Sequence, residues 1–470
     1  MPVAPGLLSP VKISNVFRLR ARRFTAFRAA SARLPSAPIP LMMRSLTYSL
    51  LFFVAALTGA KAVGAERAPN FIVILADDLG CGDISLYDGW VRTPRIDRMA
   101  REGMMFTDFH SNSSVCSPTR AAFHTGRYQQ RAGIVDVIVG RDASEKGLPP
   151  ETPTLAKVLR KAGYATALFG KWHCGHLDES NPTRLGFDEF VGFLNGGADY
   201  HRHQAWRNGL KVENVEGYST DIITERSVDF IKRNRDRPFF LHIGHQAVHN
   251  PYQTRADTPE TRAKDWKQNS VGDVNRARYR TLIEDLDQSV GRLLDTLGEL
   301  GLAENTLVFF WSDNGDVAMT PQPRPYRGTK FSHYEGGHRV PAVAWWPGRI
   351  KAGTRSDALI AGFDLFPTLV EIAGSVAKAP PNLDGISVRR HWLAGEPLPA
   401  RDLFFGYEPK LGTALRRGDW KMILKNGEAQ LYYLKDDPKE TRDLALEKPE
   451  ITAAMRSAIE EFKRTVTPGS

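Results

Sequence analysis

The sequence predicts an α/β fold, in which helices cover a mostly parallel central sheet, followed by a small C-terminal α+β subdomain with an antiparallel sheet. Two patterns predict this fold. From Asn70 onward, short and nearly continuous apolar runs alternate with amphipathic helical stretches, as in parallel sheets that are buried on both faces. After about residue 396 the apolar stretches become short and alternating, which is typical of antiparallel strands.

Four apolar runs predict buried strands of the large sheet, and polar side chains follow each of them. The runs cover residues 71–76, 164–169, 239–243 and 307–311. Beyond their ends lie Asp77 and Asp78, Lys171 and His173, His245 and His249, and Asp313 and Asn314. Ligands bind beyond the carboxyl ends of the strands in open α/β sheets. Four polar clusters at four such ends therefore predict one shared site.

Helix signals separate the strands. A Thr-Pro pair precedes each of the periodic stretches 96–101 and 155–161, and a glycine follows both. The stretch 282–297 places seven aliphatic residues on one stripe and stops near Gly301. In the C-terminal part, strands are expected at 403–406, 413–415, 420–424 and 430–434, and a helix at 450–466. We divide the chain into a targeting segment, 1–65, a large domain, 66–395, and a C-terminal subdomain, 396–470.

The formal net charge of +10 belongs mostly to the first 65 residues. They contain nine Lys and Arg residues and no Asp or Glu, so the rest of the chain carries about +1. A nucleic-acid partner needs a basic patch on the folded domain, and the sequence has no second basic block. The charge distribution therefore argues against nucleic-acid binding.

Residues 43–65 have the pattern of a secretory signal peptide. Arg44 precedes the apolar run 50–57, and small residues follow it. The run is shorter than the roughly 20 residues that span a bilayer, so no stable membrane anchor is expected. This interpretation predicts a secreted or periplasmic protein, or a lysosome-like compartment in a eukaryote, with translation starting at Met42 or Met43. The alternative is an organelle transit peptide, because the segment is rich in arginine and free of acidic residues.

The three cysteines, Cys81, Cys116 and Cys174, are widely spaced, which fits neither a disulfide scaffold nor a zinc site. Cys116 has distinctive neighbours. Ser117 followed by Pro118 predicts a helix N-cap and the first helical residue. Cys116 would then lie at a helix N-terminus, where backbone N–H groups favour an anion. Taken alone, the cysteine also fits a small buried thiol.

The residues around Cys116 belong to a longer series of motifs. Residues 116–120 read Cys-Ser-Pro-Thr-Arg, and Thr125-Gly126 continues this motif. The other motifs are Asp77-Asp78-Leu79-Gly80, Gly170-Lys171-Trp172-His173, His249-Asn250-Pro251, Asp313-Asn314-Gly315, Lys330 with Glu335-Gly336-Gly337, Arg339-Val340-Pro341 and Leu383-Asp384-Gly385. In these motifs and their order, over most of residues 68–440, the chain resembles the type I, formylglycine-dependent sulfatases, in particular arylsulfatase-like and N-acetylgalactosamine-6-sulfatase-like bacterial members. It departs from the family pattern at Cys174, where leucine is usual, and at His338, where an apolar residue or methionine is usual.

The resemblance implies an alkaline-phosphatase-like large domain that hydrolyses sulfate esters. It implies that a formylglycine-generating enzyme oxidises the cysteine of the first motif to formylglycine. The implied metal ligands are Asp77, Asp78, Cys116, Asp313 and Asn314. The residue types agree with a metal site independently, because carboxylate and amide oxygens suit a hard cation, Ca²⁺ with Mg²⁺ as the alternative, and not zinc.

The resemblance also implies a role for each polar residue in the reaction. One hydroxyl of the hydrated aldehyde attacks sulfur, while Arg120 holds the nucleophile and Lys171 the sulfate. His249 and Lys330 donate a proton to the leaving oxygen. His173 takes the proton of the second hydroxyl, so that sulfate is expelled and the aldehyde returns. An ordinary serine or cysteine lacks that second hydroxyl.

The segment 192–203 is rich in glycine, polar and aromatic residues and predicts a sugar-binding loop. Asp199 and His201 are expected to bind hydroxyls, and Tyr200 to stack on a ring; an ordinary ordered turn is the alternative. In its moderate size and secretion signal the chain resembles bacterial sulfatases that act on sulfated polysaccharides or glycosaminoglycan fragments. This resemblance implies a sulfated saccharide or aryl sulfate substrate, with galactose and N-acetylgalactosamine sulfates first. Three other histidines near these elements are interpreted as structural: His124, His242 and His245.

Two other functions remain open on the sequence alone. Phosphatases, phosphodiesterases and phosphonate hydrolases of the same superfamily share the fold, and some also use formylglycine. A non-catalytic binder of sulfated glycans, with Cys116 unmodified, is the second alternative. The metal ligands and proton donors argue against a pure binder, because binding alone needs neither.

Overall fold

The computed structural model describes residues 67–140, 147–261, 273–317, 324–408 and 412–466. Residues 66–470 form one compact unit. The predicted targeting segment, residues 1–65 with the signal peptide at 43–65, lies outside the described residues. Among the residues that the structure describes, no helix has the length and apolar character needed to cross a bilayer.

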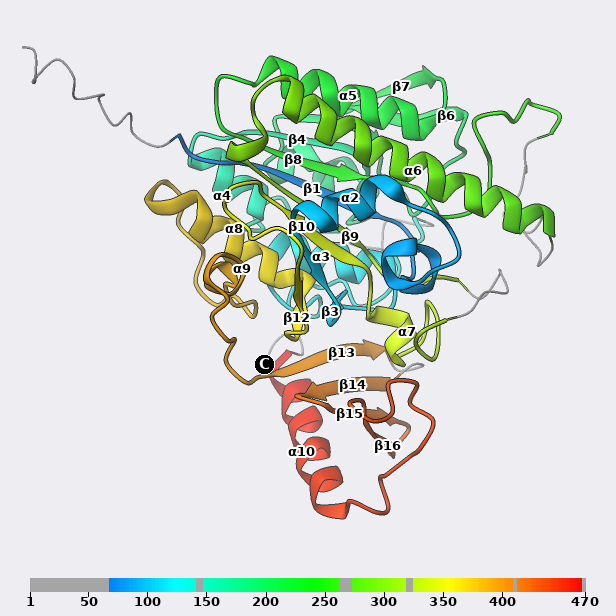
Figure 1. Ribbon diagram of the computed structural model, residues 1–470, viewed down its shortest axis with the longest axis vertical. Helices are drawn as coiled ribbons and strands as arrows, with labels where there is room; N and C mark the ends of the chain where they lie inside the picture. The colour runs from blue at the N-terminus through cyan, green and yellow to red at the C-terminus, as the bar shows by residue number, and fades with distance from the viewer. Residues whose placement is uncertain (1–66, 141–146, 262–272, 318–323, 409–411, 467–470) are drawn as a thin grey trace, which may run out of the picture. The chain divides into compact units, whose positions relative to one another are not determined.

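The four predicted strands lie side by side at the centre of a ten-stranded sheet (Figure 1). They are β1 (Asn70–Ala76), β4 (Ala165–Lys171), β8 (Phe239–Gly244) and β9 (Thr306–Ser312). They run parallel in the spatial order β9-β1-β8-β4, and every residue in them is buried. The predicted mostly parallel sheet is therefore confirmed, and the carboxyl ends of the four strands meet at one edge.

Six further strands extend this sheet on its two sides, and the sequence patterns did not predict them. On one side lie β10 (Ala342–Trp345), β2 (Met104–Phe106) and β11 (Thr354–Ser356); on the other lie β5 (Glu189–Phe193), β6 (Arg202–Asn208) and β7 (Lys211–Glu216). β10 is antiparallel to β9, and β6 pairs antiparallel with both β5 and β7. Two short strands, β3 (Phe109–His110) and β12 (Ile360–Ala361), form a separate pair.

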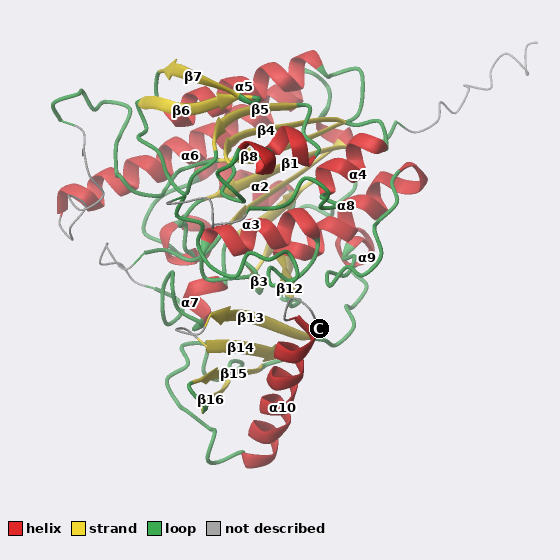
Figure 2. Ribbon diagram, turned by 180° about the vertical axis from the view of Figure 1, so that it is seen from behind, coloured by secondary structure: helices red, strands yellow, loops and turns green. Residues whose placement is uncertain are grey.

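Helices cover both faces of the large sheet (Figure 2). One face packs against α2 (Pro94–Glu102), α5 (Ser219–Arg233) and α6 (Asp273–Glu299), and the other against α3 (Cys116–Thr125), α4 (Leu155–Lys161), α8 (Leu365–Ala373) and α9 (Arg389–Ala394). Alternate residues of β1 join the two cores: Ile72 and Ile74 one, Val73 and Leu75 the other. This is the alternation that a pleated strand buried on both faces requires.

The C-terminal part is an antiparallel sheet backed by one helix, as predicted. Its strands are β13 (Asp402–Glu408), β14 (Gly412–Arg417), β15 (Trp420–Lys425) and β16 (Glu428–Tyr433), and its helix is α10 (Pro449–Val466). One face of the sheet packs on Met455 and Ile459 of α10. Residues on its other face share a core with Ala122 and Phe363 of the large domain. The small sheet is thus packed between its own helix and the large domain.

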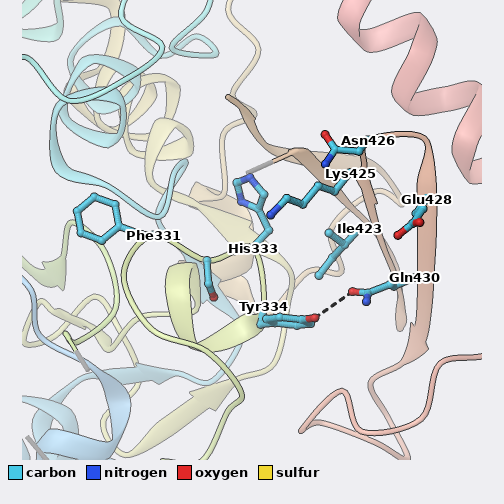
Figure 3. Close-up of a pocket in the computed structure, with 9 residues that line it drawn as sticks. Phe331, His333, Tyr334, Ile423, Lys425, Asn426, Glu428 and Gln430 are labelled. Atoms are coloured by element: carbon cyan, nitrogen blue, oxygen red, sulfur yellow. Dashed lines mark hydrogen bonds between the residues drawn. The ribbon is translucent and has the colours of Figure 1, made fainter. Parts of the chain in front are cut away.

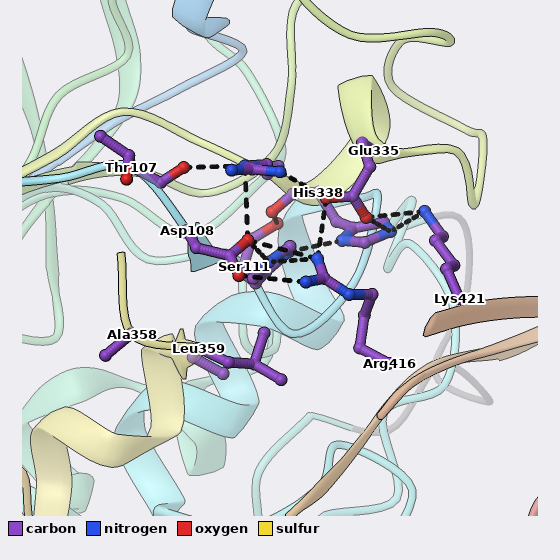
Figure 4. Close-up of polar contacts among 12 residues, drawn as sticks. Thr107, Asp108, Ser111, Glu335, His338, Ala358, Leu359, Arg416 and Lys421 are labelled. Atoms are coloured by element: carbon purple, nitrogen blue, oxygen red, sulfur yellow. Dashed lines mark hydrogen bonds and ion pairs between the residues drawn. The ribbon is translucent and has the colours of Figure 1, made fainter. Parts of the chain in front are cut away.

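A buried network of ion pairs also connects the small sheet to the large domain (Figure 4). Its centre is Glu335, the first residue of the short helix α7 (Glu335–His338). Glu335 accepts from Arg416 of β14 at 2.9 Å and from Lys421 of β15 at 2.9 Å, and Arg416 also pairs with Asp108 at 3.0 Å. His110, Glu335 and His338 lie close enough to hold a metal ion. Two buried cations already neutralise Glu335, however, so we assign this cluster to structure.

Replacing Lys421 with methionine is expected to lower the melting temperature markedly. Lys421 is fully buried, and its Nζ lies 2.9 Å from Glu335 Oε1 and 3.0 Å from Glu440 Oε1. The variant leaves two buried carboxylates without their shared cation, a change that typically costs about 3–5 kcal/mol. Calorimetry against Lys435→Met, the same change at an exposed lysine of this subdomain, measures the effect. Equal melting temperatures for the two variants would contradict the structural role.

Candidate active site

The strand ends bring together side chains that lie far apart in the sequence. Asp77 and Asp78 follow β1, Lys171 ends β4, and Asp313 follows β9. Cys116 reaches the same point from α3. All of these side chains are buried. The shared site expected at the strand ends is therefore present in the geometry of the fold.

Cys116 is the first residue of α3, and its thiol is buried among charged groups. Its Sγ lies 3.3 Å from Lys330 Nζ and 3.5 Å from Asp77 Oδ1. The predicted cap is wrong by two residues: Val115, not Ser117, is the N-cap. The reason is that the Ser117 hydroxyl accepts a hydrogen bond from the Ile138 N–H and so does not cap the helix. Cys116 nevertheless lies in the first turn, as expected.

An acidic cluster surrounds the thiol. Ligand atoms of Asp77, Asp78, Cys116 and Asp313 all lie within 4.8 Å of one another. Asn314 donates through Nδ2 to Asp78 Oδ1 at 2.7 Å, while its own Oδ1 is buried and has no hydrogen-bond partner among the described residues. A buried carbonyl oxygen without a donor is costly. A hard cation would satisfy it and would relieve the repulsion among the three carboxylates, so the residues present fit such an ion.

Three buried cations partly balance these carboxylates. Lys171 Nζ lies 2.6 Å from Asp77 Oδ2, Lys330 Nζ lies 2.6 Å from Asp78 Oδ1, and Arg120 pairs with Asp313 at 2.8 Å. Each carboxylate thus has one cationic partner within the protein. The positive charges also make the site attractive to an anion such as a sulfate group.

The surrounding charges give the carboxyl groups of this cluster different pKa values. Burial alone would raise the pKa of Asp77, but nearby cations, Lys171 first, hold it well below its usual range. Burial raises the pKa of Asp313 to about 6, and the negative charge of Asp77 adds to the effect. Burial also raises the pKa of the Cys116 thiol to about 12, so the unmodified thiol is a poor nucleophile at neutral pH.

Two histidines flank the cluster. His173 Nε2 donates to the Ile138 carbonyl at 2.9 Å, and its Nδ1 is buried without a partner among the described residues. His249 Nδ1 donates to the Asn250 carbonyl at 2.6 Å, and its Nε2 lies 3.8 Å from Asp78 Oδ2. Burial lowers the pKa of both imidazoles, which favours their neutral forms. One ring nitrogen of each is therefore fixed and the other is available for proton transfer.

The backbone is strained at this site. Asp78 and His173 have φ angles of 62° and 59°, in the left-handed region that residues with a side chain rarely occupy. Phe331, next to Lys330, has a φ of 69°. Such conformations persist where the surrounding structure holds them, and they cluster at functional sites.

The glycine-rich segment predicted to bind sugar lies against both histidines, but Tyr200 is not open to a ligand. A Cβ at Gly196 would lie 2.7 Å from His173 Cε1, so only glycine lets the segment approach this closely. Tyr200 is fully buried: its ring stacks on Tyr218 and its hydroxyl donates to the His249 carbonyl at 3.0 Å. The expectation that this ring stacks on a sugar is therefore wrong, because the tyrosine packs inside and positions the His249 loop.

The neighbours of Tyr200 also hold this loop. Asp199 Oδ1 accepts from the His201 N–H at 2.9 Å, and His201 Nε2 donates to the Thr254 carbonyl at 2.9 Å. Both side chains are only partly buried. Their contact with sugar hydroxyls stays a prediction.

The three histidines interpreted as structural and the three cysteines are buried. His124 and His242 pack among aromatic rings, and burial lowers the pKa of His124 to about 3. His245 Nε2 lies 3.0 Å from the Ser289 hydroxyl. These positions agree with structural roles. All three cysteines are free, as the sequence predicted.

The chain is similar in sequence to proteins of known families. A family model described as "Sulfatase" matches residues 69–375, and one described as "N-sulphoglucosamine sulphohydrolase, C-terminal" matches residues 329–465. N-acetylgalactosamine-6-sulfatase from Canis lupus familiaris is 33% identical over 422 residues, covering 82% of this chain and 75% of the relative. Arylsulfatase G from Mus musculus is 33% identical over 452 residues, covering 83% and 82%.

Solved structures agree with the sequence relatives. The crystal structure of Ps i-CgsB in complex with k-i-k-neocarrahexaose superimposes with a TM-score of 0.76 at 29% identity, covering 84% of this chain and 93% of that one. The alkaline-phosphatase-like fold that the motifs implied is thereby confirmed. With the family model covering most of the chain and relatives named as sulfatases over four fifths of it, this protein belongs to the sulfatase family.

Proposed function

We propose that this chain hydrolyses sulfate monoesters of saccharides, using formylglycine made from Cys116 and a bound divalent cation. The observation that carries the proposal is the position of Cys116. Its buried thiol lies within 3.5 Å of both a cation, Lys330, and a carboxylate, Asp77. A buried, protonated thiol is a poor nucleophile, whereas a hydrated aldehyde at the same position would lie beside both Lys330 and Asp77.

The proposed metal ligands are the oxygens of Asp77, Asp78, Asp313 and Asn314, together with the modified residue 116. Calcium is proposed first and magnesium second, because the donor set is all oxygen and largely anionic. When bound, the cation supplies positive charge at the nucleophile and lowers the pKa of a hydroxyl next to it. The buried Asn314 Oδ1 without a partner among the described residues supports this assignment.

Oxidation of Cys116 by a formylglycine-generating enzyme would replace the thiol with an aldehyde, whose hydrate offers one hydroxyl to attack sulfur and a second to release the sulfate. Arg120 pairs with Asp313 at 2.8 Å, and we propose that it orients the nucleophile. Lys171 is proposed to bind the sulfate oxygens.

Proton transfer falls to three residues. Asp78 and other nearby anions, acting against burial, raise the pKa of Lys330 well above its usual value, so Lys330 stays protonated and can donate to the leaving oxygen. Burial lowers the pKa of His249, and the carboxylates of Asp77 and Asp78 only partly oppose that shift. We propose His249 as the second proton donor from its position, with Nε2 3.8 Å from Asp78 Oδ2. His173 keeps Nδ1 free among the described residues and is proposed to take the proton of the second hydroxyl.

The proposed substrate is a sulfated saccharide. The relatives named above include an N-acetylgalactosamine-6-sulfatase and a protein solved with a neocarrahexaose, which supports galactose or N-acetylgalactosamine sulfates, with Asp199 and His201 binding hydroxyls. We further propose that residues 43–65 are a signal peptide and that the protein acts outside the cytoplasm, in the periplasm, the medium or a lysosome-like compartment.

A panel of esters tests the proposal. It contains 4-nitrophenyl sulfate and 4-nitrophenyl phosphate as a matched pair, with sulfated monosaccharides and tetrasaccharides of chondroitin 6-sulfate and carrageenan. Sulfatase activity predicts faster release from the aryl sulfate than from the aryl phosphate, and sulfate release from at least one saccharide. Faster release of phosphate than of sulfate would show that the protein is a phosphate ester hydrolase instead. No release from any ester would favour a non-catalytic glycan binder.

Replacing His249 with alanine is expected to slow hydrolysis of a poor-leaving-group alkyl sulfate by about 10²-fold, the scale of a lost general acid. 4-Nitrophenyl sulfate should lose much less, because its leaving group needs no proton. Steady-state kinetics on the two esters give the ratio. His245→Ala, at a buried histidine away from the cluster, is the control and should change the two rates equally. An unchanged ratio in His249→Ala would show that His249 is not the acid.

A further inference from the structure

A cavity of about 420 Å³ lies between the residues that follow Lys330 and the hairpin joining β15 to β16 (Figure 3). Phe331 and Tyr334 line one side, and Lys425, Asn426, Glu428 and Gln430 line the other. The volume is within the range of about 300–1,000 Å³ that small-molecule sites occupy. None of these residues belongs to the proposed reaction.

One wall of the cavity adjoins the proposed active site through Phe331. Phe331 follows Lys330 in the chain, and the Phe331 N–H donates to the Ser114 carbonyl at 3.1 Å, two residues before Cys116. Lys330 Nζ lies 5.5 Å from the centre of the Phe331 ring. A group bound against this ring would thus be next to the leaving oxygen that Lys330 is proposed to protonate.

Phe331 is placed unusually for a phenylalanine. Its side chain is 56% exposed, although an aromatic ring gains most from burial. Its φ of 69° is strained for a bulky residue. The fold therefore keeps the Phe331 ring exposed to solvent next to Lys330, although the backbone conformation at Phe331 is unfavourable. An exposed ring in such a position suits stacking on the apolar face of a sugar.

The opposite side offers hydrogen-bonding groups. Asn426 and Gly427, with φ angles of 51° and 82°, form the tight hairpin turn, and Lys425 and Glu428 flank it as cross-strand partners. Lys425, Asn426 and Glu428 are all exposed. Tyr334 donates to Gln430 Oε1 at 3.0 Å, and the amide NH₂ group of Gln430 can itself donate. An ammonium, a carboxylate and two amides can pair with hydroxyls that both donate and accept.

We infer that this cavity binds the saccharide unit adjacent to the one that carries the cleaved sulfate, with Phe331 stacking on its ring and Lys425, Asn426 and Glu428 pairing with its hydroxyls. The inference rests on the proposed function. With this subsite, the C-terminal hairpin takes part in substrate recognition. The enzyme is then more efficient on oligosaccharides than on the corresponding monosaccharides.

The test compares Phe331→Ala and Lys425→Ala with wild type, using the tetrasaccharides of the panel and 4-nitrophenyl sulfate. The ratio of kcat/KM for the tetrasaccharide to kcat/KM for 4-nitrophenyl sulfate is expected to fall roughly three- to tenfold in Phe331→Ala, the value of one aromatic stacking contact, mostly through KM. Lys425→Ala should lower the same ratio. Lys435→Ala removes an exposed lysine of the same subdomain outside the cavity and should leave the ratio at its wild-type value.

Each outcome decides between the two proposals. An unchanged ratio in both cavity variants overturns the subsite while leaving sulfate hydrolysis intact. Wild-type protein that cleaves 4-nitrophenyl sulfate but no tetrasaccharide also overturns the subsite. Wild-type protein that releases sulfate from no ester contradicts the proposed function itself, and the subsite with it.

Discussion

Replacing Cys116 with alanine is expected to lower the turnover of every sulfate ester by about 10⁴-fold or more, the scale of losing a covalent nucleophile. Alanine keeps the helical first turn of α3 and removes only one buried sulfur atom. The melting temperature should therefore change little. Cys116→Ser should be equally inactive by the proposed mechanism, because serine offers one hydroxyl where release of sulfate needs two.

The control is Cys81→Ala, which removes a buried thiol that has no contact with the acidic cluster: Cys81 Sγ lies 3.7 Å from the Arg339 carbonyl. This variant should retain wild-type kcat/KM. Steady-state kinetics on the three variants measure the turnover, and calorimetry measures the melting temperature. A Cys116→Ala protein with more than a few per cent of wild-type turnover would show that another group attacks sulfur.

Replacing Asp313 with asparagine is expected to lower kcat/KM by about 10²–10³-fold, the size of effects from removing one electrostatic stabiliser. Asp313 contributes to two parts of the site. It is one of four residues whose ligand atoms lie within 4.8 Å of one another, and its carboxylate pairs with the buried Arg120 at 2.8 Å. The amide weakens the cation site and leaves Arg120 without its countercharge.

The same variant separates metal binding from general loss of structure. In wild-type protein a chelator should abolish activity and lower the melting temperature, because a ligand that binds only the folded state stabilises it. Added calcium should restore both. In Asp313→Asn the calcium-dependent shift in melting temperature should be much smaller, whereas Asp295→Asn, at a half-exposed surface ion pair, should keep the full shift. Wild-type activity that survives complete chelation would exclude the proposed cation.

The centre of the fold was predictable because its strands are buried on both faces. β1, β4, β8 and β9 are continuous apolar runs, and such runs are distinctive in a sequence. The polar residues at their ends were equally visible, since a carboxylate or lysine directly after a buried strand is unusual. Once the four strands are adjacent and parallel, Asp77, Lys171 and Asp313 must meet.

The sides of the sheet were not predictable in the same way. β2, β10 and β11 have three or four residues each, too few to establish a period, and β7 alternates between half-buried and exposed residues. Their place in the sheet depends on pairing with strands far away in the sequence. The buried pairs of Glu335 with Arg416 and Lys421 join segments more than 80 residues apart, and charged residues at such positions look like ordinary surface residues until the fold is known.

Tyr200 and Phe331 show that tertiary structure also decides which residues near the site are exposed. The sequence places Tyr200 in a glycine-rich polar segment, which suggested an open ring, yet tertiary packing buries it beneath the His249 loop. Phe331 is a phenylalanine after a lysine and gave no signal by itself. Its exposure and strained backbone emerge only in the folded chain.

Mass spectrometry of the tryptic peptide 102–120, from protein made in its native host, tests the central claim most directly. The proposed mechanism predicts that residue 116 is an aldehyde, which reacts with a hydrazine reagent and has lost the sulfur of cysteine. A peptide that carries a stoichiometric free thiol at Cys116, from protein that nevertheless hydrolyses sulfate esters, would contradict that mechanism.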